Sequence, residues 1–300
     1  MRGKFRGIYP ILYTYFDAQE RLDRDAMRKQ VEACIRGGAH GIAILGFVGE
    51  YYKLTLAERR TIIEWVCEDV AGRVPVAVTV NEASVLAQLE VAKACEAAGV
   101  AWLILQPAQI KGLSEAAHVR FLGAVAAGTN LPVGIQNNPG SMDIALSTAA
   151  LVTLNRNHPN CCLMKGEGHI LYVKRLVDET AGAYDIFNGK AGLELPNTLR
   201  AGCVGMVPAP DAFDVHVKVW TLLEQGRQAE AEALHRTILP LYNFMMMPGT
   251  SEHYCWYGKA LFARRAGIEV VHQRQPAAAA DPFGEMIVAE YSQGLLSLAG

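Results

Sequence analysis

The sequence predicts a (β/α)8 barrel, an α/β fold, with further helices at its C-terminal end. Eight short apolar runs alternate with stretches of helical periodicity, which is the pattern of strands covered by helices. The runs are apolar at most positions rather than at every second one, as expected for parallel strands buried on both faces. Eight such units within about 250 residues have the size of a closed barrel. An open doubly wound sheet ranks second, because no glycine-rich phosphate turn follows the first run.

Each predicted strand is followed by a loop and a helical pattern. The expected strands are residues 7–16, 41–46, 74–80, 101–107, 132–139, 162–166, 184–189 and 205–210. Thr55 and Glu58 have the spacing of a capping box, Ser84 and Ser114 can cap the next two helices, and a helical pattern begins at about His169. These signals divide the chain into regular strand and helix units.

The C-terminal part of the chain has helical patterns only, over residues 227–247, 251–267 and 282–298. Between the last two, residues 273–281 form a loop or a short helical turn. We expect residues 1–226 to form the barrel and residues 227–300 to pack on it, because this tail is too short and too amphipathic to be an independent domain.

The composition indicates a protein with a small-molecule partner. The 300 residues are 51% hydrophobic and 19% charged, without a membrane-spanning apolar run. A net charge of −2 with scattered basic residues offers no surface for nucleic acid or anionic lipid. The seven cysteines have no CxxC spacing and no HExxH pair occurs, so we expect reduced thiols, no metal and no cofactor. No apolar segment follows the basic first residues, so we expect a cytoplasmic location.

The most informative residue is Lys165, at the carboxyl end of the sixth predicted strand. Strand carboxyl ends carry the active site of such barrels. Burial there disfavours the ammonium form, and a neutral amine can attack a ketone. Glu167 lies two residues further on, so an extended strand directs both side chains to one side as a candidate nucleophile and base. Two alternatives stay open: an ion pair that keeps Lys165 inert, and Lys190 at the next strand end as the reactive lysine.

Other strand ends supply candidate binding residues. Gly46 and Gly49 allow a tight turn whose backbone N–H groups can hold a carboxylate. Asn and Gln side chains can bond to substrate hydroxyls, although at such positions they as often bond to loop backbone. The candidate substrate-binding residues are Phe47, Val48, Gln136, Asn137, Asn188 and Gly189.

Several segments, in order, match one enzyme family. They are GIYPILYT (7–14), GFVGE (46–50), LT and ER (54–55 and 58–59), AGRVPV (71–76), NNPG (137–140) and MK (164–165). Over residues 7 to about 265 the chain resembles the dihydrodipicolinate synthase and N-acetylneuraminate lyase family of class I (β/α)8 enzymes. The resemblance implies that Lys165 forms an imine with the C2 ketone of a 2-oxo acid, that amides of the 46–50 turn hold its carboxylate, and that the protein is a homotetramer or homodimer.

Departures from the family pattern concern the acid–base chemistry. Gln136 stands where synthases and lyases carry a tyrosine, and an amide cannot replace a phenol in proton transfer. Phe47 and Val48 replace two threonines, and Ser141 takes the place of the synthase's substrate-binding arginine. These losses argue against dihydrodipicolinate synthase activity. In its active-site pattern the chain is most similar to 2-keto-3-deoxy sugar acid dehydratases such as L-2-keto-3-deoxyarabonate dehydratase, with Gln at the tyrosine position and Glu two residues after the lysine.

We therefore expect a Schiff-base lyase that dehydrates a 2-keto-3-deoxy sugar acid. An iminium on Lys165 makes the C3 hydrogen acidic, and Glu167 can remove it and return the proton as the 4-hydroxyl leaves. A bound water is the alternative base. Two other functions remain open: a pyruvate-releasing aldolase for 2-keto-3-deoxy sugar acids, and a non-catalytic sugar-acid-binding relative.

Overall fold

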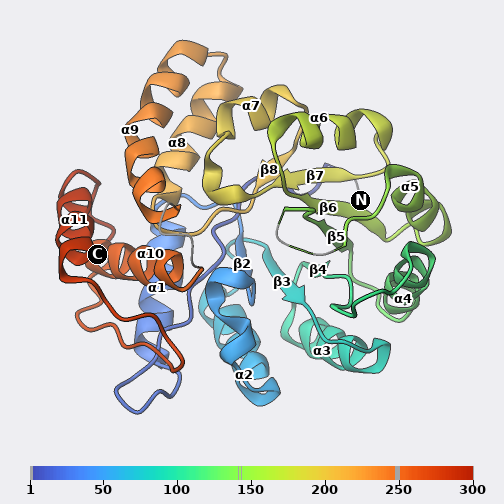
Figure 1. The fold of residues 1–300 in the computed structure, drawn as a ribbon, viewed down its shortest axis with the longest axis horizontal. Helices are drawn as coiled ribbons and strands as arrows, with labels where there is room; N and C mark the ends of the chain where they lie inside the picture. Colours follow the sequence, from blue (N-terminus) through green and yellow to red (C-terminus); the bar gives the residue numbers. More distant parts are fainter. Residues whose placement is uncertain (1–2, 141, 143, 247–250, 300) are drawn as a thin grey trace. The chain divides into compact units, whose positions relative to one another are not determined.

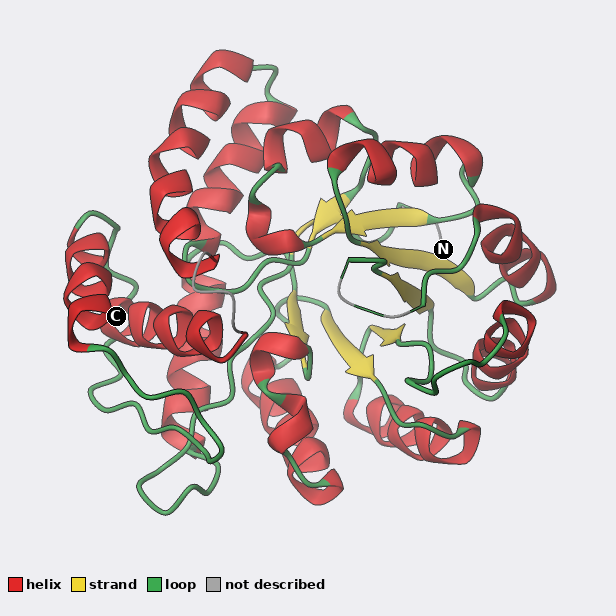
Figure 2. Ribbon diagram, in the orientation of Figure 1, coloured by secondary structure: helices red, strands yellow, loops and turns green. Residues whose placement is uncertain are grey.

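The computed structural model describes residues 3–140, 142, 144–246 and 251–299. The chain forms two compact units, which we describe separately. Unit 1 comprises residues 1–7 and 75–207, and unit 2 comprises residues 8–74 and 208–300. Figure 1 labels the helices and strands, and Figure 2 shows how they alternate along the chain.

Within the described residues, eight strands form one sheet in the order β1-β8-β7-β6-β5-β4-β3-β2. They are β1 (Gly7–Ile8), β2 (Ile42–Ile44), β3 (Val76–Val80), β4 (Trp102–Leu105), β5 (Val133–Asn137), β6 (Cys161–Gly166), β7 (Asp185–Asn188) and β8 (Gly205–Met206). The ladders from β3 to β8 are parallel, and Ile11, just past β1, bridges Ala43 of β2 in parallel. This order, with helices between the strands, confirms the predicted (β/α)8 barrel and its C-terminal helices.

Unit 1 places β3 to β8 beside helices that run along the outer side of the strands (Figure 1). The helices are α3 (Val85–Ala98), α4 (Glu115–Ala127), α5 (Thr148–Asn157), α6 (Ile170–Glu179) and α7 (Leu195–Arg200). A Cβ on Gly134 of β5 would lie 2.9 Å from Cζ3 of Trp102, so the glycine makes room for that indole. Trp102 in turn stacks on Phe5 and Phe187, with ring centroids 6.1 and 5.4 Å apart.

Unit 2 contains β2 and the remaining long helices. They are α1 (Arg24–Arg36), α2 (Leu56–Val70), α8 (Phe213–Glu224), α9 (Gln228–Met246), α10 (Ser251–Ala266) and α11 (Pro282–Gln293). They pack in pairs, α1 on α2, α8 on α9 and α10 on α11. The predicted division of the chain at residue 226 remains a prediction. None of the described helices is long and apolar enough to cross a membrane.

The predicted helix caps are confirmed. The side chains of Ser84 and Ser114 each accept a backbone N–H at the start of α3 and α4. His169, where a helix was expected to begin, accepts one at the start of α6. Thr55 and Glu58 form both bonds of a capping box at the start of α2. These short-range signals fix the helix starts because they depend only on neighbouring residues.

Some predicted element lengths are wrong. The first strand covers Gly7–Ile8 rather than 7–16, and the last covers Gly205–Met206 rather than 205–210. Pro10, Pro208 and Pro210 have no N–H for a ladder, so regular pairing stops before them. Helix α11 ends at Gln293 rather than 298, with Gly294 as its C-cap. Residues 273–281 form a loop, which is one of the two possibilities expected for them. Residue 247, the expected end of α9, lies outside the described residues.

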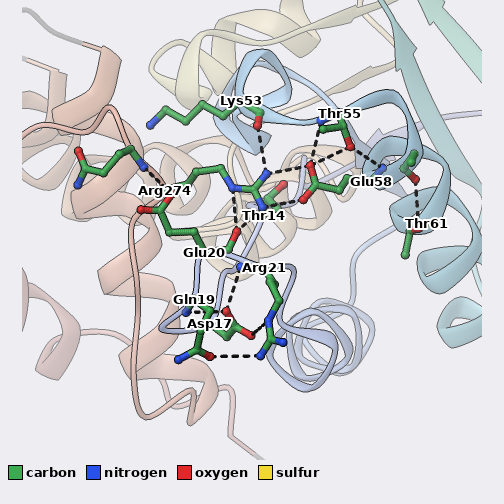
Figure 3. Close-up of polar contacts among 12 residues, drawn as sticks. Thr14, Asp17, Gln19, Glu20, Arg21, Lys53, Thr55, Glu58, Thr61 and Arg274 are labelled. Carbon is green, nitrogen blue, oxygen red and sulfur yellow. Dashed lines mark hydrogen bonds and ion pairs between the residues drawn. The ribbon is translucent and has the colours of Figure 1, made fainter.

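Arg274 ties this C-terminal loop to the start of α2 in unit 2 (Figure 3). Its guanidinium donates to both carboxylate oxygens of Glu58, at 2.6 and 2.9 Å, and to the carbonyl of Lys53 at 3.1 Å. It also donates to the carbonyl of Glu20 and lies 4.2 Å from the ring centroid of Phe16. The bonds from Arg274 hold the pKa of Glu58 below its usual value. One planar side chain thus joins three separate segments of unit 2.

A second buried polar group in unit 2 is Asp211. Its Oδ1 accepts bonds from the hydroxyl of Tyr242 and the N–H of Ala212, both at 3.2 Å, whereas Oδ2 has no hydrogen-bond partner among the described residues. Burial raises the pKa of Asp211 to about 6. Folding of this unit is therefore linked to proton binding.

We predict that Arg274→Ala lowers the free energy of unfolding by about 2 kcal/mol, because the half-buried Glu58 loses its charged partner. Urea denaturation measures the effect. The matched control is Arg227→Ala, which removes a pair with Glu230 that is at least half exposed on both sides. No measurable change is expected for the control, and equal effects of the two variants would contradict the role of Arg274.

We predict that Asp211→Asn stabilises the protein more at neutral pH than at acid pH. The folded pKa of about 6 lies above the ordinary value of 3.8. The stability that this group contributes is therefore fully present below pH 3.8 and is lost as the pH rises through about 6. Between about pH 4 and about pH 8 the difference between variant and wild type should grow by up to about 3 kcal/mol. A difference that is independent of pH would refute the linkage, and all other titrating groups cancel in this comparison.

Candidate active site

Lys165 is the fifth residue of β6, a strand that is buried along its whole length. The sheet register pairs it with Gln136 of β5 and with Phe187 of β7. Only 7% of Lys165 is exposed, whereas Lys190, the alternative lysine, is exposed. Of the two lysines, Lys165 is thus the buried one.

Glu167 is surrounded by hydrogen-bond donors. Its Oε2 lies 3.3 Å from Nζ of Lys165 and accepts bonds from Nε2 of Gln136 at 2.8 Å and Nδ2 of Asn138 at 3.2 Å. Its Oε1 accepts the backbone N–H of Lys190 at 3.3 Å. The two amides and the N–H donate hydrogen bonds and the Lys165 ammonium adds a positive charge, so the four groups compensate the carboxylate for the water it has lost.

Gly189 leaves the space that Glu167 occupies. A Cβ at this position would overlap Oε1 of Glu167 and lie 2.7 Å from its Cδ. The glycine predicted as a binding residue is thus next to the catalytic candidate. Its observed effect is to admit the Glu167 carboxylate.

Gln106 extends the polar contacts to a third strand. It follows β4, and its Nε2 donates to Oε1 of Gln136 at 2.8 Å. Sequence reasoning missed Gln106 and Asn138. The sheet register would have indicated Gln106, because Leu105 pairs with Ile135 and places the next residue of each strand side by side.

Asn137 and Asn188 face away from this cluster. Asn137 exchanges bonds with the backbone of Leu146, at 2.8 and 3.0 Å, and donates to the hydroxyl of Tyr172 at 3.0 Å. Asn188 donates to Oγ1 of Thr198 at 3.0 Å. Asn137 follows Gln136 and Asn188 follows Phe187, the two residues that the register pairs with Lys165. Successive strand side chains point to opposite faces, so both asparagines lie on the other face. Their observed bonds brace loops and helix α7, and their role in substrate binding stays a prediction.

The turn after β2 belongs to unit 2. Phe47–Gly49 forms a single 3-10 turn in which Phe47 is half exposed and Val48 is buried. Oγ1 of Thr14 donates to the carbonyl of Gly49 at 2.6 Å and fixes the turn. Glu50 follows with φ of 52° and is ion-paired with Lys53 and Lys259. Carboxylate binding by this turn, with Phe47 and Val48, remains a prediction, and Ser141 lies outside the described residues.

No group of three or more His, Cys, Asp or Glu side chains that could hold a metal ion occurs in the part of the chain that the structure describes.

The groups of the cluster that can take part in a reaction are the amine of Lys165 and the carboxylate of Glu167. An ammonium 3.3 Å from a carboxylate can pass its proton to it and become a nucleophilic amine. Both side chains keep a small exposed fraction, 7% and 8%, whereas Asn137 and Asn188 are 0% and 1% exposed. The former pair is thus slightly more exposed than the latter.

Comparison with known proteins gives consistent matches. The model of the dihydrodipicolinate synthetase family matches residues 4–280. A 4-hydroxy-tetrahydrodipicolinate synthase from Thermus thermophilus is 32% identical over 207 residues, which are 68% of this chain and 69% of the relative. YagE of Escherichia coli, named provisionally as a 2-dehydro-3-deoxy-D-gluconate aldolase, is 27% identical over 242 residues, 79% of this chain and 80% of YagE.

Solved structures show the same fold. A Pseudomonas aeruginosa protein, described provisionally as a dihydrodipicolinate synthetase, superimposes with a TM-score of 0.88 at 28% identity, over 98% of this chain and 99% of the other. YagE, solved in complex with pyruvate, also gives 0.88, at 24% identity over 97% of this chain and 99% of its own. The matched length, the identity and the common barrel together show that this chain belongs to the dihydrodipicolinate synthetase family, whose members are lyases.

Proposed function

We propose that this protein is a Schiff-base lyase that dehydrates a 2-keto-3-deoxy sugar acid similar to L-2-keto-3-deoxyarabonate. The observation that carries the proposal is the buried Lys165–Glu167 pair, with an amide rather than a phenol bonded to Glu167. Lys165 is the nucleophile and Glu167 is the only carboxylate within ion-pair distance of it among the described residues.

The first stage forms the imine. Glu167 accepts a proton from the Lys165 ammonium, and the neutral amine attacks the C2 carbonyl. The nitrogen of the adduct gives a second proton to the C2 oxygen, which forms a carbinolamine. Glu167 then returns the first proton to the C2 hydroxyl of this carbinolamine, which leaves as water. The products of this stage are an iminium on Lys165 and a Glu167 carboxylate, ready to act again as a base.

The second stage removes the 4-hydroxyl. The iminium acidifies the C3 hydrogen, which the Glu167 carboxylate removes to give an enamine. As the C4–O bond breaks, Glu167 donates its proton to the departing hydroxide, and water forms. Hydrolysis of the iminium releases the dehydrated 2-oxo acid and restores Lys165. Apart from the transfer from nitrogen to oxygen within the first adduct, one carboxylate accepts and returns the protons of both stages.

Gln136 supports dehydration over the synthase reaction. Its amide has no proton of suitable acidity to transfer, and its Nε2 is engaged with Glu167 at 2.8 Å. A phenol at this position would offer a second acid–base group beside Lys165. With an amide there, Glu167 alone has to serve first as the base and then as the acid of the reaction.

Aldol cleavage of the same class of substrate is the second candidate. The name of YagE, a relative over 79% of this chain, favours it. Cleavage would need a base for the 4-hydroxyl proton and would release pyruvate. A non-catalytic sugar-acid-binding relative is the remaining alternative, and the homodimeric or homotetrameric assembly and the cytoplasmic location also remain predictions.

We predict that borohydride in the presence of pyruvate adds a covalent mass to the wild-type protein at Lys165. Peptide mass spectrometry locates the label. Lys165→Arg should abolish labelling, and Lys190→Arg, the matched control at the next strand end, should retain it. Labelling of Lys190, or no labelling of the wild type, would exclude Lys165 as the nucleophile.

We predict that Glu167→Gln lowers turnover by about 10²–10⁴-fold, because general acid–base assistance is lost, while the final extent of imine trapping stays near that of the wild type. The exposed Glu179, changed to Gln, serves as the matched control and should keep full activity. Wild-type turnover by Glu167→Gln would remove Glu167 from the mechanism.

We predict that Gly189→Ala lowers turnover at least tenfold, because its Cβ pushes the Glu167 carboxylate away from Lys165. Gly294→Ala is the control, since its Cβ would meet only the Tyr291 carbonyl, at 3.5 Å. Thermal melting of both variants checks folding. A folded Gly189→Ala protein with full activity would show that the position of Glu167 is not critical.

A further inference from the structure

Gln106 lies in a fixed position next to the reactive cluster. Its backbone N–H donates to the carbonyl of Val80 at 2.9 Å, and its own carbonyl accepts Nε2 of Gln88 at 3.3 Å. Gln88 is fully buried and also donates to the carbonyl of Glu82 at 2.9 Å. Pro107 follows and restricts Gln106 to extended backbone. The Gln106 side chain is therefore presented from a rigid support.

The direction of the hydrogen bonds decides what Gln106 can do. An ionised carboxylate only accepts, so Gln136 must turn its NH2 group toward Glu167 and its oxygen toward Gln106. The NH2 group of Gln106 donates to that oxygen at 2.8 Å. The two hydrogen bonds thus run in one direction, from Gln106 to Gln136 and from Gln136 to Glu167. Hydrogen bonds aligned in this manner polarise and strengthen one another.

Without Gln106, Oε1 of Gln136 has no donor, and only the bond from Nε2 to Glu167 still orients the amide. Rotation of that amide would turn its oxygen toward Glu167 and place two acceptors together. Gln106 and Gln136 are only 7% and 6% exposed, so bulk water is a poor substitute for the missing donor.

We propose that Gln106 is a positioning residue for Glu167, which acts by fixing the donor orientation of the Gln136 amide. The inference rests on the proposed function of Glu167 as the acid–base group. Gln106 bonds to Gln136 rather than to Lys165 or Glu167, so its effect passes through Gln136 alone.

A double-mutant cycle tests whether Gln106 acts through Gln136. Gln106→Met, close in size and without a donor, should lower kcat about tenfold with little change in KM and with the full extent of imine trapping. Gln106→Glu, which only accepts when ionised, should force the wrong Gln136 orientation and lower kcat further. In a Gln136→Met background, both changes should have no additional effect. The exposed Gln109, changed to Met, is the control and should leave kcat unchanged.

An equal loss from Gln106→Met in the wild-type and Gln136→Met backgrounds would overturn the inference, as would an unchanged kcat in the wild-type background. A crystal structure of Gln106→Met gives a readout that needs no turnover. We expect the contact between Nε2 of Gln136 and Oε2 of Glu167, 2.8 Å in the wild type, to be lost. Its persistence would overturn the inference, whereas failure of the wild type to trap a 2-oxo acid would instead overturn the proposed function.

Discussion

The arrangement of the candidate site depends on the contact between the Lys165 ammonium and the Glu167 carboxylate. Both groups have left water, and such a transfer costs several kcal/mol per ion unless other groups replace the lost solvent. For Glu167 the replacements are Lys165, Gln136, Asn138 and the N–H of Lys190. In the proposed function, the same contact also supplies the acceptor for the proton that the Lys165 ammonium loses. Whether the Lys165–Glu167 pair is inert or catalytic therefore depends on whether a 2-oxo acid can enter and react with the Lys165 amine.

The parallel sheet explains why these groups meet. Neighbouring strands β4, β5 and β6 place Gln106, Gln136 and Lys165 at the same level on one side, and Glu167 follows two residues later on that side. Asn137 and Asn188 are each one position out of phase and turn toward loop and helix partners. A single geometric rule, alternation along a strand, thus separates the cluster around Lys165 and Glu167 from the side chains that brace its surroundings.

Much of the fold could be predicted from the sequence because its signals are local. Apolar runs located the eight strands, and Thr55, Glu58, Ser84 and Ser114 marked helix starts that depend on bonds over three residues. Lys165 and Glu167 could also be placed, since a strand end and a two-residue spacing are read directly from the chain. Gln106, Asn138 and the space beside Gly189 could not, because they follow from contacts between strands far apart in sequence. Asn137 was different: its alternation with Gln136 was visible, but its partners Leu146 and Tyr172 were not.

The central claim is that one carboxylate beside the Schiff-base lysine directs the substrate to lose water rather than to break a carbon–carbon bond. The most direct measurement is the identification of products after incubation with 2-keto-3-deoxy pentonates and hexonates of both configurations. For at least one of these substrates we expect a product lighter by one water, formed without pyruvate. Release of pyruvate together with an aldehyde, in amounts equal to the substrate consumed, would contradict the claim.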